Sequence, residues 1–335
     1  MPKTKSFSIA MAYCGAVIGA GFATGREVVD FFTTYGSPGL VGVLVATGLF
    51  VWAGIVILNI THQEPVYSYI DLLKYLLRFR VLVVVVDLLF LATLLVGVGV
   101  MTAAGGAILA DWGLWYPGGC AIFLGTCVTI LRAGGRGFVK VNAWLVPGLA
   151  VMIVGLCLAK LALPVVNLPR PGVYGSALLY AAYNIAIAAV ALSTLKGQLN
   201  KKAAFWGGLG GGLLVGALLL AIYLATQSGG HSEIPMLDVA SAVLGRWQWI
   251  YQLTLAAAVL TTALANMHGL ASRVTGKSWY QSGLVIIAVM GLVISQYGFA
   301  NLVGLFYPLL GLCNIVLLAG LCYYSVTRLT GKLNR

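Results

Sequence analysis

The chain has 335 residues, of which 61% are hydrophobic and only 8% are charged, and its formal net charge is +12. This composition excludes an ordinary water-soluble domain, in which about 25% of residues are charged, and predicts a chain whose main solvent is lipid. A spanning helix needs about 20 mostly apolar residues, and such stretches follow one another here. They are apolar all round, whereas the strands of an outer-membrane barrel alternate apolar and polar residues.

Ten apolar windows predict an all-α polytopic membrane protein with about ten spanning helices and no separate soluble domain. The windows cover residues 7–34, 38–61, 81–110, 115–132, 140–163, 173–195, 202–226, 246–270, 281–297 and 301–325. Between the second and third windows, PVYSYIDLLKYLLRFR places Ile70, Leu73 and Leu77 on one helical face and its basic residues elsewhere. This pattern predicts an amphipathic helix on a membrane surface.

Lysine and arginine are distributed unevenly between the two sides that these windows define. If the N-terminus lies inside, nearly all of them gather on the inner side, whereas Lys160, Arg170 and Arg246 lie outside and Arg26 lies in or near a span. The positive-inside rule then places both termini in the cytoplasm, in the plasma (inner) membrane of a prokaryote. Anchoring at anionic lipid accounts for the net charge, so a nucleic-acid partner is not expected. The oligomeric state is not indicated.

The ten windows divide into two sets of five, which meet at the proline-rich segment LPVVNLPRP. Because five is odd, the second set must enter the membrane from the opposite side. Residues 1–163 and 164–335 are therefore expected to form the two inverted-topology repeats of a single transmembrane transporter domain, an arrangement that many secondary transporters share.

The first window contains the most unusual segment, CGAVIGAGFATGRE, in which Gly15, Gly19, Gly21 and Gly25 fall within eleven residues. Each glycine in a helix costs up to about 1 kcal/mol relative to alanine. The glycines indicate either close helix packing through GxxxG pairs or a discontinuous helix whose unwound backbone offers carbonyls to a cation and N–H groups to an anionic substrate. A dinucleotide-binding loop is disfavoured, because the spacing differs and no strand precedes it.

The segment GAVIGAGFATGREVVDFF resembles the first helix of the amino acid-polyamine-organocation superfamily, in particular its YkvI-like branch, which is related to the sodium-dependent neurotransmitter symporters. The resemblance implies the LeuT-type fold, a 5+5 inverted repeat in which helices one and six are broken at the substrate site and helices one and eight form a sodium site. It implies that the carbonyls of Gly15 and Ile18 bind the cation. Gly19, Ala20 and Gly21 would form the unwound segment beside the substrate.

The eighth window carries Thr261 and Thr262, which lie about as deep in the membrane as Gly19. The resemblance implies that this hydroxyl pair binds sodium together with the carbonyl of Ala258. Oxygen ligands suit a hard cation. Threonine hydroxyls in membrane helices also bond their own backbone, so both interpretations stay open.

The sixth window reads LLYAAYNIAIAA and departs from the family pattern, because it lacks the glycine that is common at the break. Tyr180, Tyr183 and Asn184 still supply polar groups around the expected substrate, and an asparagine in mid-membrane requires a partner. Thr93 and Gly97 of the third window are expected on the same cavity.

Ionisable side chains cost at least about 2.5 to 3.5 kcal/mol each at the centre of a membrane. Arg26, Glu27 and Asp30 follow the glycines, and they either pair with one another, form part of an external gate, or line a solvated vestibule. Asp87 is either a proton carrier or the partner of a neighbouring arginine. Some proton-coupled relatives place a fifth-helix lysine in the vacant sodium site; Lys160 is the candidate for this role here, but its position is too near the outer surface for that site.

The outer segment SGGHSEIPMLDVASAVLG has a proline near the start of a short helical pattern. In the family the equivalent loop is an extracellular lid, and the alternative is a surface connector. The three histidines and eight acidic residues are scattered, so an enzyme is not predicted and no cofactor is expected beyond a coupling sodium ion.

The function predicted from the sequence is secondary active transport, as a cation-coupled symporter of a small organic solute such as an amino acid. The alternatives are a proton-coupled transporter of a nucleobase or other small organic ion, and a membrane receptor that uses a transporter fold without flux.

Overall fold

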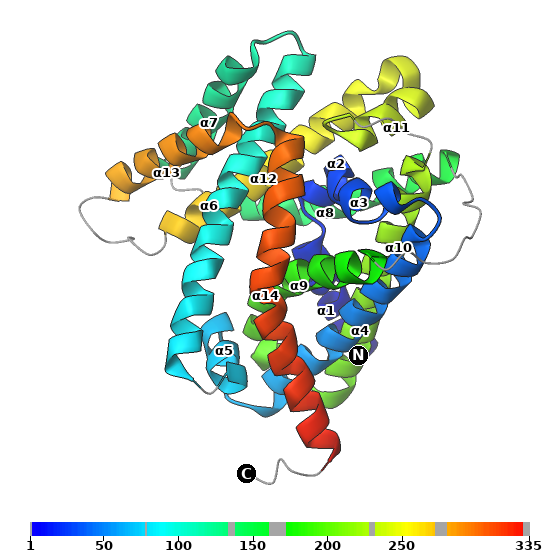
Figure 1. Cartoon of the computed structure of the whole chain (residues 1–335), viewed down its shortest axis with the longest axis vertical. Helices are drawn as coiled ribbons and strands as arrows, with labels where there is room; N and C mark the ends of the chain where they lie inside the picture. The colour runs from blue at the N-terminus through cyan, green and yellow to red at the C-terminus, as the bar shows by residue number, and fades with distance from the viewer. Residues whose placement is uncertain are drawn as a thin grey trace.

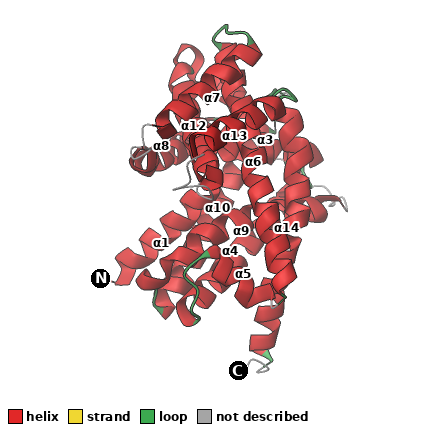
Figure 2. Ribbon diagram, turned by 90° about the vertical axis from the view of Figure 1, so that its left-hand side faces the viewer, coloured by secondary structure: helices red, strands yellow, loops and turns green. Residues whose placement is uncertain are grey.

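The computed structural model describes residues 2–77, 79–132, 138–160, 172–227, 232–271 and 280–330. Within these ranges the chain is helical, with short turns and no strand (Figure 2). The α-helices are α1 (Pro2–Val17), α2 (Ala20–Thr24), α3 (Arg26–Phe31), α4 (Gly39–Gln63), α5 (Tyr69–Leu77), α6 (Arg80–Asp111), α7 (Tyr116–Arg132), α8 (Phe138–Ala159), α9 (Gly172–Leu192), α10 (Lys201–Thr226), α11 (Pro235–Leu244), α12 (Trp249–Ala271), α13 (Tyr280–Ser295) and α14 (Phe299–Leu329). Three 3₁₀ turns are η1 (Thr33–Tyr35), η2 (Ser193–Gln198) and η3 (Gly245–Trp247).

Every predicted span coincides with helical structure in the described part of the chain. Within the described ranges, six helices are long and apolar enough to cross a membrane, namely α4, α6, α9 with η2, α10, α12 and α14. The remaining predicted spans fall on α1 to α3, α7, α8 and α13, whose apolar segments are shorter. The polytopic all-α class predicted from the sequence is confirmed.

The helices form two sets. In one set, α10 packs against α4 and α1, and α4 packs against α9; in the other, α6 packs against α12, α13 and α7. Figures 1 and 2 both show α7, α12 and α13 in the upper part of the molecule and α1, α4, α9 and α10 in the lower part. The long helix α14 contacts both α9 and α6, so it joins the two sets.

Glycines allow the closest helix contact of the first set. A Cβ atom at Gly208 of α10 would lie 2.5 Å from the backbone nitrogen of Ile55, and one at Gly212 would lie 2.6 Å from the Cα of Val51, both in α4. In lipid the hydrophobic effect does not drive helices together, so association depends on such close backbone packing. The glycine-rich segment of α10 therefore holds α4 and α10 together.

The helix predicted on a membrane surface is α5. Leu72, Leu73 and Leu76 are buried against the spanning helices, whereas Lys74 is exposed, which confirms an amphipathic helix. The buried face is rotated from the predicted one, because Ile70 is only half-buried.

Candidate functional site

The first span is broken twice, as the four glycines predict. α1 ends at Val17 and α2 begins at Ala20; between them, Gly19 has extended backbone angles (φ −110°, ψ −165°). Gly25, with φ +72°, separates α2 from α3. This left-handed conformation favours glycine, because a Cβ atom clashes with the backbone there.

The first break frees backbone carbonyls from the helical ladder. In a continuous helix the N–H of Gly19 would donate to the carbonyl of Gly15, but it donates instead to the carbonyl of Val17 at 3.0 Å. Ile18 and Gly19 lie outside both helices, whereas Ala20 and Gly21 belong to α2, so the predicted unwound segment Gly19 to Gly21 is correct only for Gly19. The carbonyls of Gly15 and Ile18, the two predicted cation ligands, therefore lie where the helix is interrupted.

A cavity of about 360 Å³ lies at this break, between the two helix sets. Its volume and its mixed polar and apolar wall are typical of small-molecule sites. The predicted site residues that line it are Gly15, Ile18, Gly19, Ala20, Gly21, Glu27, Thr93, Gly97, Tyr183, Asn184, Ala258, Thr261 and Thr262.

The predicted cation ligands of α12 face the break. Thr261 Oγ1 donates a hydrogen bond to the carbonyl of Ala258 at 3.1 Å, so these two oxygens lie side by side. Thr262 Oγ1 is 3.7 Å from the position that a Cβ atom would occupy at Gly19. Thr261 therefore bonds its own helix backbone, which is one of the two interpretations of a threonine in a membrane helix. This bond does not prevent the Thr261 oxygen from also binding an ion.

The prediction that the sixth span is broken near its middle is wrong. α9 runs as one α-helix from Gly172 to Leu192, and only then tightens into the 3₁₀ turn η2. The segment from Tyr180 to Asn184 contains no glycine or proline, and its alanines favour a helix. The amide of Asn184 donates to the carbonyl of Tyr180 at 3.0 Å, so a bond within the helix partners this asparagine.

Tyr180 is not among the described residues that line the cavity. Its fully buried ring packs against Phe22, Phe31, Phe32 and Phe50, with ring centroids 5.0 to 6.3 Å apart. The prediction that it contacts substrate is therefore not supported by its position, which is that of a packing residue.

Two of the described polar residues that line the cavity were not predicted from the sequence. Tyr307 of α14 packs against Tyr183, with ring centroids 4.6 Å apart. Asn266 of α12 has its amide nitrogen 2.5 Å from the position that a Cβ atom would occupy at Gly97. Asn266 follows Thr262 by four residues, and this spacing on a helix was the signal that could have placed it on the same face.

The three ionisable residues of α3 separate into a pair and a single acid. Arg26 binds Asp30 through two contacts, Nη2 to Oδ1 at 2.9 Å and Nε to Oδ2 at 3.0 Å. Arg26 Nη1 also donates to the carbonyl of Ser232 at 3.1 Å. Glu27 lies apart from this pair, is only 4% exposed and lines the cavity.

The short helix predicted in the outer segment is α11, and it packs on the broken span. It contacts α2, α3, α8 and α10. Met236 lies against the second break, where a Cβ atom at Gly25 would come within 2.7 Å of its Cγ. α11 therefore covers α2 and α3 rather than lying apart as a surface connector.

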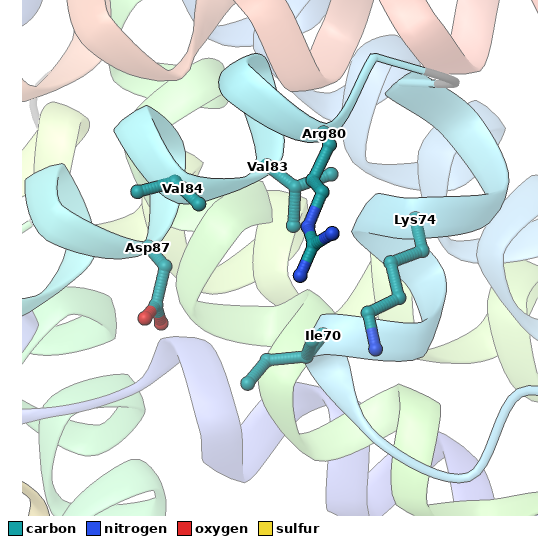
Figure 3. Close-up of a pocket in the computed structure, with 6 residues that line it drawn as sticks. All are labelled: Ile70, Lys74, Arg80, Val83, Val84 and Asp87. Atoms are coloured by element: carbon teal, nitrogen blue, oxygen red, sulfur yellow. The ribbon is translucent and has the colours of Figure 1, made fainter.

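Asp87 and Lys160 do not line the cavity at the break. Asp87 lines a separate pocket of about 470 Å³ between α5 and α6, across from Lys74 and Arg80 (Figure 3). Lys160 follows the last residue of α8.

Comparisons with known proteins give relatives of nearly the same length. No model of a known protein family matches the chain. The membrane protein YkvI of Bacillus subtilis (strain 168), described as uncharacterized, is 27% identical over 334 residues, which cover 95% of this chain and 96% of YkvI. The protein YyaD of the same organism is 23% identical over 329 residues, which cover 93% of this chain and 94% of YyaD.

Solved structures resemble the fold. MhsT in complex with L-phenylalanine superposes with a TM-score of 0.65 at 15% identity, covering 95% of this chain and 88% of MhsT. Mhp1, a nucleobase-cation-symport-1 family transporter in a closed conformation with bromovinylhydantoin bound, gives 0.62 at 17% identity, covering 91% and 74%. The chain has the LeuT-type fold. Mhp1 is described as a transporter, and the cavity of this chain lies at the interrupted first helix.

Proposed function

We propose that the protein is a secondary active transporter, a cation-coupled symporter of a small organic solute such as an amino acid, in the YkvI-like branch of the amino acid-polyamine-organocation superfamily. The position of the cavity carries this proposal. It lies at a helix break between two helix sets, where rocking of one set against the other would open it to either side of a membrane in turn. The nearly full-length similarity to YkvI supports the branch.

The proposed substrate site consists of the break at Gly19 with the first residues of α2, Ala20 and Gly21, the side chains of Tyr183 and Asn184, and the α6 positions Thr93 and Gly97. All of them line the cavity. An amino acid is favoured because MhsT, with a similar fold, binds L-phenylalanine in its solved structure.

The proposed coupling ion is sodium. The carbonyls of Gly15, Ile18 and Ala258 and the hydroxyls of Thr261 and Thr262 are neutral oxygens that line one side of the cavity. Such a set suits a hard monovalent cation, because it offers only oxygen and no thiolate or imidazole. Among the described residues, no group of three or more His, Cys, Asp or Glu side chains is placed to hold a metal ion.

Gating and topology complete the proposal. α11 acts as a lid on the outer side, and the Arg26–Asp30 pair, tied to Ser232, holds it against the broken span. Both termini lie in the cytoplasm, as the excess of Lys and Arg on the inner side favours. Residues 1–163 and 164–335 form the two inverted repeats.

Uptake of radiolabelled amino acids into vesicles, under an imposed sodium gradient or an imposed pH gradient, tests this function. Thr262→Ala should weaken the sodium dependence by roughly 5- to 150-fold, the usual range of linked sites. Thr254→Ala is the matched control on the same helix, because the Thr254 hydroxyl is exposed and bonds its own backbone at Ile250.

Three outcomes would contradict the proposal in different ways. Uptake that follows the pH gradient and ignores sodium would make the oxygen cluster structural and would favour proton coupling through Glu27, Asp87 or Lys160. Uptake of a nucleobase in place of amino acids would change the substrate class. Binding of solutes without uptake would indicate a receptor.

A further inference from the structure

Among the described residues that line the cavity, Glu27 is the only Asp, Glu, Lys, Arg or His side chain. The side chain is 4% exposed, and it reaches the cavity from α3, across the first turn of α2. Gly21 makes this position possible, because a Cβ atom there would lie 1.5 Å from Glu27 Oε1. The carboxylate therefore lies directly against the backbone of the first turn of α2, next to the break.

No described residue supplies a counter-charge to Glu27. Among the described residues that line the cavity there is no Lys, Arg or His. Arg26, its neighbour in the chain, is engaged by Asp30 and Ser232. In the described part of the chain, no hydrogen-bond donor to the Glu27 carboxylate is present either. A carboxylate removed from water is costly unless it is paired or takes up a proton, so the ionised form of Glu27 makes this cavity complementary to a cation.

The surroundings of Glu27 favour an organic cation over a bare ion. Tyr183 and Tyr307 line the same cavity as Glu27 and form a ring pair, with ring centroids 4.6 Å apart. Aromatic faces attract alkylammonium groups. The neutral oxygens proposed to bind sodium belong to other residues, such as Thr261 and Thr262 of α12. The inorganic cation and the organic cation would therefore have separate partners.

We propose that the solute carries a net-positive ammonium group and that Glu27 is its counter-ion, which makes the transported class small organic amines. This inference rests on the proposed transport function and narrows it. A solute carboxylate has no basic partner among the described lining residues, so an amine should bind more tightly than the amino acid with the same skeleton.

Matched probes test the inference on purified full-length protein in detergent at fixed sodium concentration. The first set is 2-phenylethylamine, L-phenylalanine, 3-phenylpropionate and 2-phenylethanol; the second is isoamylamine, L-leucine, 4-methylpentanoate and isoamyl alcohol. Binding is measured by thermal shift and by isothermal titration calorimetry. The amine of at least one set should bind best, and Glu27→Gln should weaken it by on the order of 100-fold, because a buried charge loses its partner.

Two further variants keep the test decisive. Glu27→Asp retains the carboxylate on a side chain that is one methylene shorter, so the charge lies farther from the ligand. This variant should keep the preference for amines at reduced affinity. Asp71→Asn removes one negative charge from α5, away from the cavity, and should bind amines like the wild type. The melting temperature without ligand shows whether Glu27→Gln still folds, and Glu27→Asp serves as the test if it does not.

Several results would overturn the inference. One is the absence of any thermal shift with both amines, and another is equal binding of the amine and neutral probes. A third is unchanged amine binding in Glu27→Gln. A fourth is a Glu27→Gln variant that keeps its amine binding and loses only the dependence of uptake on the sodium or pH gradient. Uptake of an amino acid that is insensitive to Glu27→Gln would refute this inference and leave the transport function standing. Absence of uptake of every solute, with amine binding retained, would refute transport alone.

Discussion

Replacing Gly21 by alanine should displace the Glu27 carboxylate from the cavity without changing residue 27 itself. The new Cβ atom would lie 1.5 Å from Glu27 Oε1 and 2.5 Å from Cδ, and ordinary contact begins at 3.4 Å, so the carboxylate has to move by about 2 Å. The three nearest atoms to that Cβ position all belong to Glu27. The carboxylate, the far end of a flexible side chain, is therefore displaced rather than the fold.

The magnitude follows from Coulomb's law. With an effective dielectric constant of about 20, moving a carboxylate from about 3 Å to about 5 Å from an ammonium group removes about 2 kcal/mol of attraction, which is roughly 30-fold in affinity. Folding stability should hardly change. Alanine gains up to about 1 kcal/mol over glycine in a helix, and the displaced rotamer costs about 0.5 to 1.5 kcal/mol.

A double-mutant cycle of Gly21→Ala and Glu27→Ala provides the assay, with amine affinity from calorimetry as the readout. Because the first substitution acts only through the second residue, the double variant should bind no more weakly than Glu27→Ala alone. If the two losses multiplied instead, Gly21 would act on the ligand by another route, and the placement of Glu27 over this glycine would not matter.

Two predictions concern the rest of the molecule. Gly212→Val should destabilise the protein by about 1 to 3 kcal/mol, because the new Cβ atom would lie 2.6 Å from the backbone of Val51. Thermal melting in detergent measures this loss. The control Gly48→Val, which has open space around its Cβ position, should not lower the melting temperature. The Ser68 hydroxyl donates to Asp71 at 2.8 Å and lowers the pKa of that carboxyl, so its stabilisation of α5 is complete above about pH 4 and is lost as the pH falls through the lowered pKa. Ser68→Ala should raise that pKa in a carbon-13 carboxyl titration, and an unchanged value would exclude this bond as the cause.

The sequence was informative where a local backbone property decides the structure. Glycine clustering predicted the interrupted first span, and two adjacent threonines predicted the polar face of α12, because both signals depend on residues close together in the chain. The roles of these oxygens as sodium ligands and the repeat relation of the two halves stay predictions.

The sequence was less informative about which side of a helix meets the cavity. α9 is apolar all round, so its periodicity does not distinguish Tyr180, which packs among phenylalanines, from Tyr183, which lines the cavity. The rotation of such a helix is set by its neighbours. Tyr307 comes from the last helix of the chain, and its partnership with Tyr183 depends on long-range packing that no local pattern records.

The order of residues in α3 has a consequence for how the molecule would respond to occupancy. Arg26, bound to the segment before α11, and Glu27, facing the cavity, are consecutive residues of a helix only six residues long, bounded at its start by the left-handed Gly25. If α3 rotates as a rigid unit, a rotation that withdraws Arg26 from Ser232 also moves the Glu27 carboxylate. A ligand bound to Glu27 as proposed would then raise the free energy needed to release α11. By reciprocity, closure of α11 would increase the affinity for the ligand by the same factor. Two neighbouring residues would thus couple ligand binding to closure of α11 without a conformational change in the rest of the protein.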